Sequence, residues 1–200
     1  MAVDPGIQVL LDIIDGMDQP AISESTPQQA RDGFKMMTVG MRQPFMVIPV
    51  RDVQDASIPG PEGAIPVRVY RPDADGDLPT IVFFHGGAFV IGDLDTHDNQ
   101  ARRLCRDTES VVVSVDYRLA PEAPWPAGVD DAMAATQWVA DHISAYGNEP
   151  ALLAVAGDSA GGNFAAVVAQ LCSDSGVVSL AAQLLIYPAT DFDPDVTVNA

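Results

Sequence analysis

The sequence predicts an α/β protein built on a doubly wound, mostly parallel sheet. Short apolar runs alternate with segments of helical periodicity along most of the chain, a pattern typical of strands that helices cover on both faces. Two alternating segments precede these runs and predict an antiparallel hairpin. A Gly-x-Ser-x-Gly pattern, Gly157–Gly161, lies where one apolar run passes into a helix, which is the strand-to-helix context of a nucleophile elbow.

Two helices are expected before the first strand, and residues 1–44 are predicted to form a unit outside the sheet. Asp4-Pro5 provides an N-cap and a proline at the first helical position, and Thr26 with Gln29 matches a capping box. The apolar residues at helical spacing are Ile7, Leu10, Leu11, Ile14 and Met17 in the first helix and Ala30, Phe34, Met37 and Met41 in the second. Such a methionine-rich stripe fits both core packing and a mobile lid over an apolar substrate, and both interpretations stay open.

Residues 45–200 are predicted to form the sheet and the helices that cover it. The expected hairpin strands are 45–53 and 65–71, with a loop at 58–63 between them. The expected buried strands are 80–84, 110–115, 152–155 and 181–187, and the expected helices are 96–107, 127–143 and 163–171. This alternation predicts right-handed crossovers between parallel neighbours.

The composition excludes several classes of protein. The 200 residues carry a net charge of −18, which argues against nucleic acid and against an anionic membrane surface, because both require a basic face. The sequence shows neither a signal peptide nor a membrane-spanning stretch, so a cytoplasmic location is expected. Cys105 and Cys172 lie far apart in helix-like segments and predict buried reduced thiols, not a disulfide or a zinc site.

Ser159 is the candidate nucleophile. The small residues Gly157, Ala160 and Gly161 let strand and helix approach each other, so that the serine is exposed at the carboxyl end of the strand, where ligands bind in open α/β sheets. A glycine-rich turn could instead cradle a phosphate, but the chain has no Gly-x-Gly-x-x-Gly and no Gly-Lys-Ser/Thr pattern. A turn without chemistry is the remaining alternative.

A second motif, His85-Gly86-Gly87, follows the apolar run at 80–84. When a serine attacks an ester carbonyl, the oxygen becomes negative, and backbone amides must point at it from about 2.7–3.1 Å. Glycine leaves this approach unobstructed. The expected oxyanion donors are therefore the amides of Gly86, Gly87 and Ala160.

These motifs together resemble the hormone-sensitive-lipase-like carboxylesterases, the Gly-Asp-x-Gly lipolytic group of the α/β-hydrolase fold. The resemblance covers nearly the whole chain and is carried by four segments, which are His85 to Phe89, Tyr117 to Glu122, Gly157 to Gly162 and Leu185 to Pro188. It implies hydrolysis of esters with short to medium acyl chains through an acyl-enzyme, without a metal or cofactor. The implied partner is a small-molecule ester, and a homodimer of the full-length form is left open.

The resemblance also implies roles for individual residues. Ser159 would be the nucleophile, and the N-terminal helices would form part of a cap. The remaining motif residues would be structural, namely His85, Gly157, Asp158 and Gly161. In this family the triad base is a residue other than the histidine of the oxyanion loop.

The sequence offers no base for the serine. The triad of this fold runs Ser, then Asp or Glu, then His, yet no histidine follows Ser159, and four acidic residues come too early for the acid: Asp174, Asp191, Asp193 and Asp195. His97 is expected to cap or pack at a helix start, and His142 to lie late in a helix, where a positive charge suits the dipole. We therefore expect a C-terminally truncated member of the family that lacks the last strands and is inactive or insoluble when expressed alone.

Other functions remain open at this point. A hydrolase scaffold that keeps the elbow and the oxyanion loop but lacks the base could bind a small carboxylate or ester without turning it over. The same fold also supports amidases and thioesterases, because a fold does not determine its substrate. Phe89, after the oxyanion loop, fits contact with an acyl group and core packing equally well.

Overall fold

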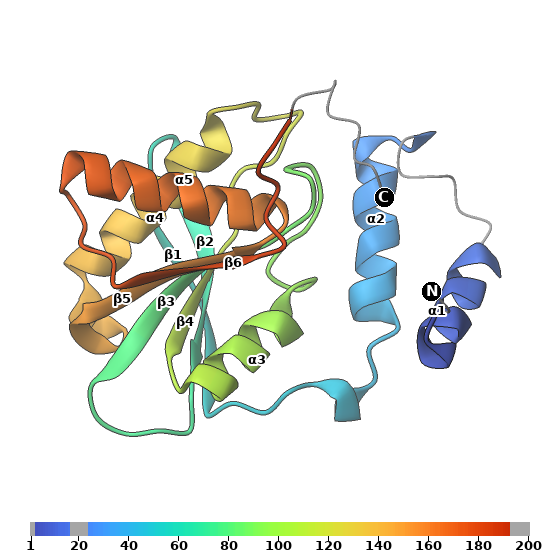
Figure 1. Cartoon of the computed structure of the whole chain (residues 1–200), viewed down its shortest axis with the longest axis horizontal. Helices are drawn as coiled ribbons and strands as arrows, with labels where there is room; N and C mark the ends of the chain where they lie inside the picture. The colour runs from blue at the N-terminus through green and yellow to red at the C-terminus, as the bar shows by residue number, and fades with distance from the viewer. Residues whose placement is uncertain (1–2, 17–23, 193–200) are drawn as a thin grey trace.

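A six-stranded sheet forms the centre of the structure, a computed structural model that describes residues 3–16 and 24–192 (Figure 1). Its strand order is β1-β2-β4-β3-β5-β6. The β1–β2 and β2–β4 pairs are antiparallel, and the other three pairs are parallel. The strands are β1 (Asp52–Gly60), β2 (Gly63–Arg71), β3 (Leu78–Phe84), β4 (Val111–Val115), β5 (Asn148–Asp158) and β6 (Ala182–Ile186). The predicted α/β-hydrolase sheet, mostly parallel with an antiparallel N-terminal pair, is confirmed.

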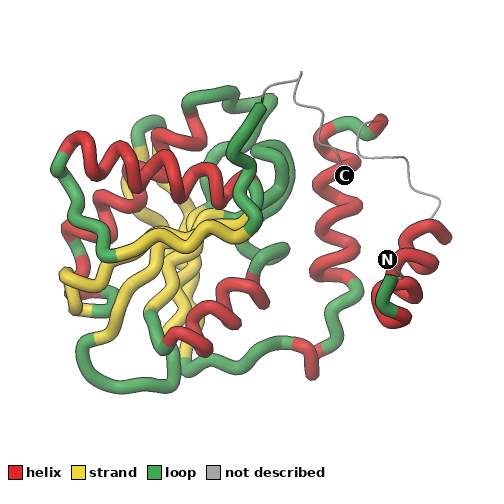
Figure 2. Tube along the Cα trace, viewed as in Figure 1, coloured by secondary structure: helices red, strands yellow, loops and turns green. Residues whose placement is uncertain are grey.

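Helices cover both faces of the sheet, as Figures 1 and 2 show. The helices α4 and α5 lie on one face, α3 lies on the other, and α1 and α2 stand beside the sheet. Their bounds are α1 (Pro5–Gly16), α2 (Pro27–Lys35), α3 (Asp98–Thr108), α4 (Ala127–Asp141) and α5 (Ala160–Ser175). A π-helical turn (Met36–Gly40) continues α2, and short 3₁₀ turns lie at Pro44–Met46 and Ile143–Ala145.

The buried strands divide their side chains between two cores. Successive side chains of a strand point to opposite faces, so Val82 and Phe84 of β3 pack in the core under α4 and α5, whereas Ile81 and Phe83 pack in the core under α3. Both cysteines are free and buried, as predicted. The continuous apolar runs are thus explained by burial on both faces.

The predicted bounds of the hairpin are wrong. Residues 45–51 contain no strand, and β1 begins only at Asp52 and runs on to Gly60, through residues that the sequence predicted to be a loop. Within the described segments β1 pairs with β2 alone and is an edge strand, so Pro59 is compatible with it, because a missing N–H on an edge strand does not break a ladder. The turn that remains between Gly60 and Gly63 is only two residues long.

The N-terminal helices begin where the sequence predicted. Asp4 Oδ1 accepts a hydrogen bond from the Gly6 amide at 2.8 Å, and Thr26 and Gln29 form the predicted capping box. Met37 and Met41 are exposed and border a cavity of about 300 Å³ with Ile13 and Ile14 of α1. These methionines are therefore outside the hydrophobic core, and the lid interpretation remains a prediction. Met17 and the side chain of Leu10 lie outside the described parts of the chain.

None of the helices in the described segments is long and apolar enough to cross a membrane. Among the described strands, β6 has β5 as its only neighbour in the sheet. Three of its five residues are exposed, so the expectation of a buried strand at 181–187 is wrong, because β6 lies at the edge of this sheet. Asp193, Asp195 and the residues after them fall outside the described part of the chain.

Candidate active site

Strand register brings the two predicted motifs together. In the parallel β3–β5 pair, Phe84 lies opposite Gly157. The segment that follows β3 therefore runs beside the segment that follows β5, so Gly86 and Asp158 meet although they are 72 positions apart in the sequence. Carboxyl ends of neighbouring parallel strands are the usual place of ligand sites in open α/β sheets.

Ser159 has a strained backbone. Its φ of 52° and ψ of −115° are outside the usual regions for a residue with a side chain. Three hydrogen bonds hold this conformation: the Ser159 amide donates to the carbonyl of Ile186 at 2.9 Å, and its carbonyl accepts from Asn163 and from Ala189 at 3.1 Å each. The serine stands between the end of β5 and the start of α5, which is the position of an elbow nucleophile.

The elbow depends on close contact between α5 and the end of β3. A Cβ atom added to Gly161 would overlap the carbonyl oxygen of Phe84, and one added to Gly157 would overlap the carbonyl oxygen of Gly161. Only glycine fits at these two positions without moving a strand or a helix. The small residues that the sequence pattern singled out are therefore explained by backbone proximity.

The Gly86 amide is engaged within the protein, which corrects one expected oxyanion donor. It donates to Asp158 Oδ1 at 3.0 Å, so in this arrangement it does not face an incoming carbonyl oxygen. Gly87 adopts a φ of +132°, where a side chain would be strained. Among the described residues, no oxygen accepts a hydrogen bond from the amides of Gly87 or Ala160.

Asp158 ties the elbow to the oxyanion loop, a role that the sequence did not reveal. Its carboxylate is buried. One oxygen accepts the Gly86 amide, and the other lies 3.6 Å from Nε2 of His97. His97 packs at the start of α3, as expected, but its side chain does not cap the helix.

His85 is fully buried in an aromatic stack. Its ring lies 4.4 Å from the ring of Tyr117 and 5.2 Å from that of His97, measured between centroids. Nδ1 is 2.8 Å from the Gly86 carbonyl, and the Tyr117 hydroxyl donates to the His85 carbonyl at 2.6 Å. Burial, reinforced by His97, lowers the pKa of His85 to about 4, so the ring is neutral near pH 7.

The structure also places His142 and Phe89, the remaining candidate residues of the sequence analysis. The ring of His142 stacks on Trp138 with 3.6 Å between centroids, at the carboxyl end of α4. Phe89 is half-buried and packs against Phe164, with 5.1 Å between centroids, and against Phe192 at 6.0 Å. The hydrogen bonds of the three histidines go to groups other than Ser159.

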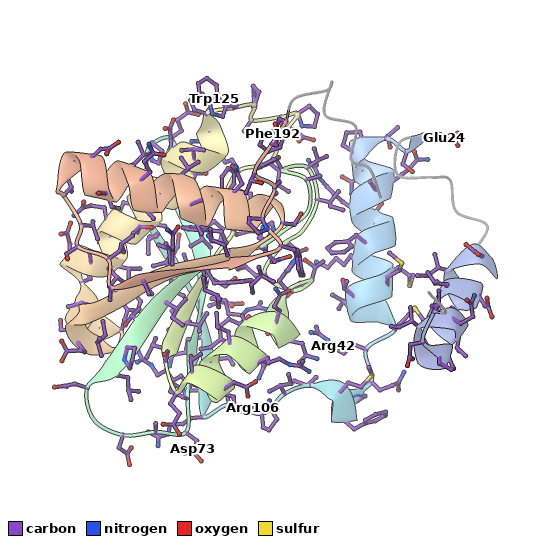
Figure 3. The ribbon with its side chains drawn as sticks, in the orientation of Figure 1. Glu24, Arg42, Asp73, Arg106, Trp125 and Phe192 are labelled. Carbon is purple, nitrogen blue, oxygen red and sulfur yellow. The ribbon has the colours of Figure 1, made fainter. Side chains whose placement is uncertain are left out.

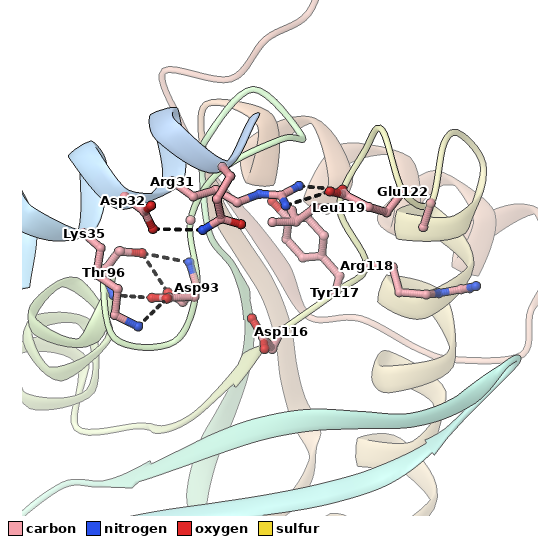
Figure 4. Close-up of a pocket in the computed structure, with 13 residues that line it drawn as sticks. Arg31, Asp32, Lys35, Asp93, Thr96, Asp116, Tyr117, Arg118, Leu119 and Glu122 are labelled. Carbon is pink, nitrogen blue, oxygen red and sulfur yellow. Dashed lines mark hydrogen bonds and ion pairs between the residues drawn. The ribbon is translucent and has the colours of Figure 1, made fainter. Parts of the chain in front are cut away.

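A polar cavity of about 730 Å³ lies beside the oxyanion loop, between α2 and the segments 92–96 and 116–123 (Figure 4). Arg31 and Lys35 of α2 and the carboxylates of Asp93, Asp116 and Glu122 line it. Ser159 is not among its lining residues, so this cavity is separate from the elbow. Within the described segments, no group of three His, Cys, Asp or Glu side chains is arranged to hold a metal ion.

Asp116 predicts a pH dependence of stability. Burial, reinforced by Asp93 and Asp95, raises the pKa of Asp116 to about 6, whereas an aspartate in an unfolded chain titrates near 3.9. Between these values the folded state binds more protons than the unfolded state, so this group lowers stability as pH rises through the window. Asp116→Asn should stabilise the protein by about 1–3 kcal/mol at pH 7.5 and by much less near pH 4.5.

Urea unfolding at several pH values measures this effect. Asp174→Asn serves as the control, because it removes the same charge at an exposed position near the end of α5. Its free energy of unfolding should differ little from that of wild type, and the difference should not grow with pH. Parallel stability curves for wild type and Asp116→Asn would contradict the prediction.

Comparison with known proteins places these features in a family. A model of the alpha/beta hydrolase fold matches residues 81–199. The chain is 45% identical over 197 residues to the carboxylic ester hydrolase LipN of Mycobacterium tuberculosis, a match that covers 95% of this chain and 51% of that protein. It is 42% identical to the carboxylesterase NlhH of the same organism, with 99% of this chain and 61% of that protein covered. The chain thus spans about half to three-fifths of these relatives.

A solved structure agrees with the sequence comparison. An ester hydrolase from the metagenome of Lake Arreo, complexed with a derivative of bipyridine phosphonate, superimposes with a TM-score of 0.88 at 41% identity. The match covers 96% of this chain and 62% of that one.

Proposed function

Because the chain belongs to the α/β-hydrolase-fold family and to its hormone-sensitive-lipase-like carboxylesterases, we propose that it provides the nucleophile and the oxyanion donors of a serine carboxylesterase. The observation that carries the proposal is the strained Ser159 at the β5–α5 turn, with the Gly86–Asp158 hydrogen bond beside it. The substrates are esters with short to medium acyl chains. The relatives named above are ester hydrolases or carboxylesterases by name, which supports the reaction class.

The proposed reaction has two stages. Ser159 Oγ attacks the acyl carbon and gives its proton to a general base, and the carbonyl oxygen becomes negative. The amides of Gly87 and Ala160 donate to this oxygen, and the start of α5 adds the positive end of its dipole. The tetrahedral intermediate then collapses to an acyl-serine, and the alcohol leaves with the proton from the base. Water, activated by the same base, hydrolyses the acyl-serine and regenerates Ser159.

We place the general base outside these 200 residues. The three histidines of the chain make their contacts in the oxyanion stack, at the start of α3 and at the end of α4, and a serine without an adjacent base is a weak nucleophile near neutral pH. A polypeptide that also carries the acid and the histidine of the triad is then required for turnover. Residues 1–200 alone should show only the weak catalysis of an oxyanion hole.

Ser159→Ala tests the proposal. In a polypeptide that carries this sequence together with the triad acid and histidine, the substitution should lower kcat for p-nitrophenyl butyrate by at least about 10⁴-fold, because removal of a triad member removes nucleophilic catalysis as a whole. Ser173→Ala, at an exposed position of α5, should keep wild-type activity. Residues 1–200 alone serve as a second, inactive reference. More than a tenth of the wild-type rate in Ser159→Ala would refute the serine assignment.

A non-catalytic role in binding is the alternative, and the lack of a histidine beside Ser159 is the observation that favours it. In that case wild type and Ser159→Ala would both bind a small carboxylate or ester, and neither would hydrolyse it. Assays with p-nitrophenyl thioesters and anilides on the active protein distinguish an esterase from a thioesterase or an amidase.

A further inference from the structure

The turn that carries Gly87 is held at its outer end by a residue of α2. We define the oxyanion turn as residues 85–92. At its inner end Asp158 accepts the Gly86 amide. At its outer end Nε of Arg31 donates to the Val90 carbonyl at 2.8 Å. The turn is thus fixed on one side by the elbow and on the other by a helix that lies outside the sheet.

The oxyanion turn is a strained segment that needs such support. Gly87, Ala88 and Phe89 all have positive φ values, of 132°, 50° and 64°, and positive φ is uncommon for residues with a side chain. The Gly87 carbonyl accepts from the amides of Val90 and Ile91 at 3.0 and 2.9 Å. A shift of Val90 therefore moves the Gly87 carbonyl, and through the φ and ψ of Gly87 it changes the direction of the neighbouring Gly87 N–H.

Arg31 uses the planar shape of its guanidinium to bridge two segments. Figure 4 shows its paired contact with Glu122. Besides Val90, Arg31 donates to the Ala120 carbonyl at 3.0 Å and forms a paired contact with the carboxylate of Glu122 at 2.9 and 2.7 Å. The Ala120 amide in turn donates to the Phe89 carbonyl at 2.9 Å. Lysine offers a single ammonium group and cannot satisfy these acceptors in the same geometry.

The contacts of Arg31 differ in strength. Glu122 is 62% exposed, so solvent screens its ion pair with Arg31. The Arg31 side chain itself is only 23% exposed, and its bonds to the Val90 and Ala120 carbonyls are partly buried. The bonds to the two backbone carbonyls are therefore the ones that fix position.

We propose that Arg31 is a positioning residue that aligns the Gly87 amide for the oxyanion, an inference that rests on the proposed esterase function. Through Arg31, the helix α2, part of the predicted N-terminal cap, thereby contributes to transition-state stabilisation. Complete loss of one oxyanion donor costs about 10²–10³-fold in kcat. Misalignment of the Gly87 donor should cost less, so we expect Arg31→Gln to lower kcat about 10-fold, and KM to change by less than about 3-fold because the ground state gains little from the donor.

The experiment measures kcat, KM and the affinity for a trifluoromethyl ketone in a polypeptide that carries this sequence together with the triad acid and histidine. The ketone forms a hemiketal oxyanion on the serine, so its affinity reports on the donors, and we expect Arg31→Gln to weaken it about 10-fold as well. The matched control is Arg51→Gln, because Arg51 also bonds two acceptors, Asp73 and Asp75, but at the remote end of the hairpin. Its kcat and ketone affinity should be those of wild type. Glu122→Gln, which keeps Arg31 and its carbonyl contacts, should show a smaller loss than Arg31→Gln.

The outcomes separate this inference from the proposed function. If Arg31→Gln keeps the kcat and ketone affinity of wild type while Ser159→Ala is inactive, Arg31 is not a positioning residue, and the proposed function stands. A Ser159→Ala protein that keeps its activity overturns the proposed function. If Arg31→Gln does not fold, Arg31→Lys decides, because it keeps the charge and the stem but not the fork. A loss of about 10-fold in both kcat and ketone affinity in Arg31→Lys supports the proposal, and wild-type values of both in Arg31→Lys refute it.

Discussion

Gly161→Ala is expected to abolish folding or to lower the free energy of unfolding by more than about 4 kcal/mol. The added Cβ would overlap the carbonyl oxygen of Phe84 and would lie 2.6 Å from the carbonyl oxygen of His85. Both oxygens belong to backbone at the end of β3, which the central position of β3 in the sheet holds in place. The first turn of α5 would therefore have to move away from the sheet, and Ser159 would move with it.

Gly33→Ala is the matched control for this substitution. Gly33 lies inside α2, and a Cβ at this position would meet no atom within 4 Å. Alanine is preferred over glycine in a helix by about 1 kcal/mol, so this variant should be as stable as wild type or more stable. Urea unfolding followed by circular dichroism measures both variants. Equal midpoints for Gly161→Ala and wild type would show that the α5–β3 contact is not as close as described.

Asp98→Asn should destabilise the protein by about 3–5 kcal/mol, because it removes one partner of a buried ionic cluster. The carboxylate of Asp98 is buried at the first turn of α3. It accepts hydrogen bonds from the Tyr70 hydroxyl at 3.1 Å, from Arg102 Nε at 2.8 Å and from Arg42 at 3.3 Å. Arg42 follows α2 in the chain and reaches toward α3 (Figure 3). The substitution leaves these two guanidinium groups facing a neutral amide and loosens the contact of the N-terminal segment with the core.

Asp107→Asn provides the comparison within the same helix. Asp107 pairs with Arg106 at 2.7 Å, and both side chains are about half exposed. An exposed pair of this kind contributes little, so the unfolding free energy should change by less than about 0.5 kcal/mol. If Asp98→Asn and Asp107→Asn lowered the free energy of unfolding by similar amounts, the contacts around Asp98 would not form the buried ionic cluster described above.

The sequence alone was sufficient for features that depend on local chemistry. The capping box of α2 depends on Thr26 and Gln29, three residues apart, and the strand β3 depends on a continuous apolar run. The elbow could be located because Ser159 lies among small residues that only a close strand-to-helix turn requires. In each case the residues that determine the structure are near one another in the sequence.

Two errors came from interactions across the chain. The hairpin bounds were wrong because the edge position of β1, which makes Pro59 acceptable in a strand, becomes known only from the strand order. The amide of Gly86 was expected to face the substrate, yet it donates to Asp158. Nothing near Gly86 in the sequence indicates an acceptor 72 positions away, because the β3–β5 register brings it there.

The contacts of Arg31 and His97 could not be predicted from the sequence either. No sequence motif singled out Arg31, and the tertiary structure places its guanidinium on the Val90 carbonyl. Periodicity and motif spacing state which face of an element is buried and which residues suit a turn. They do not state which element covers that face. The sequence therefore determined the candidate nucleophile, its turn and the fold class, and only the packing of distant segments decided which groups hold that turn in place.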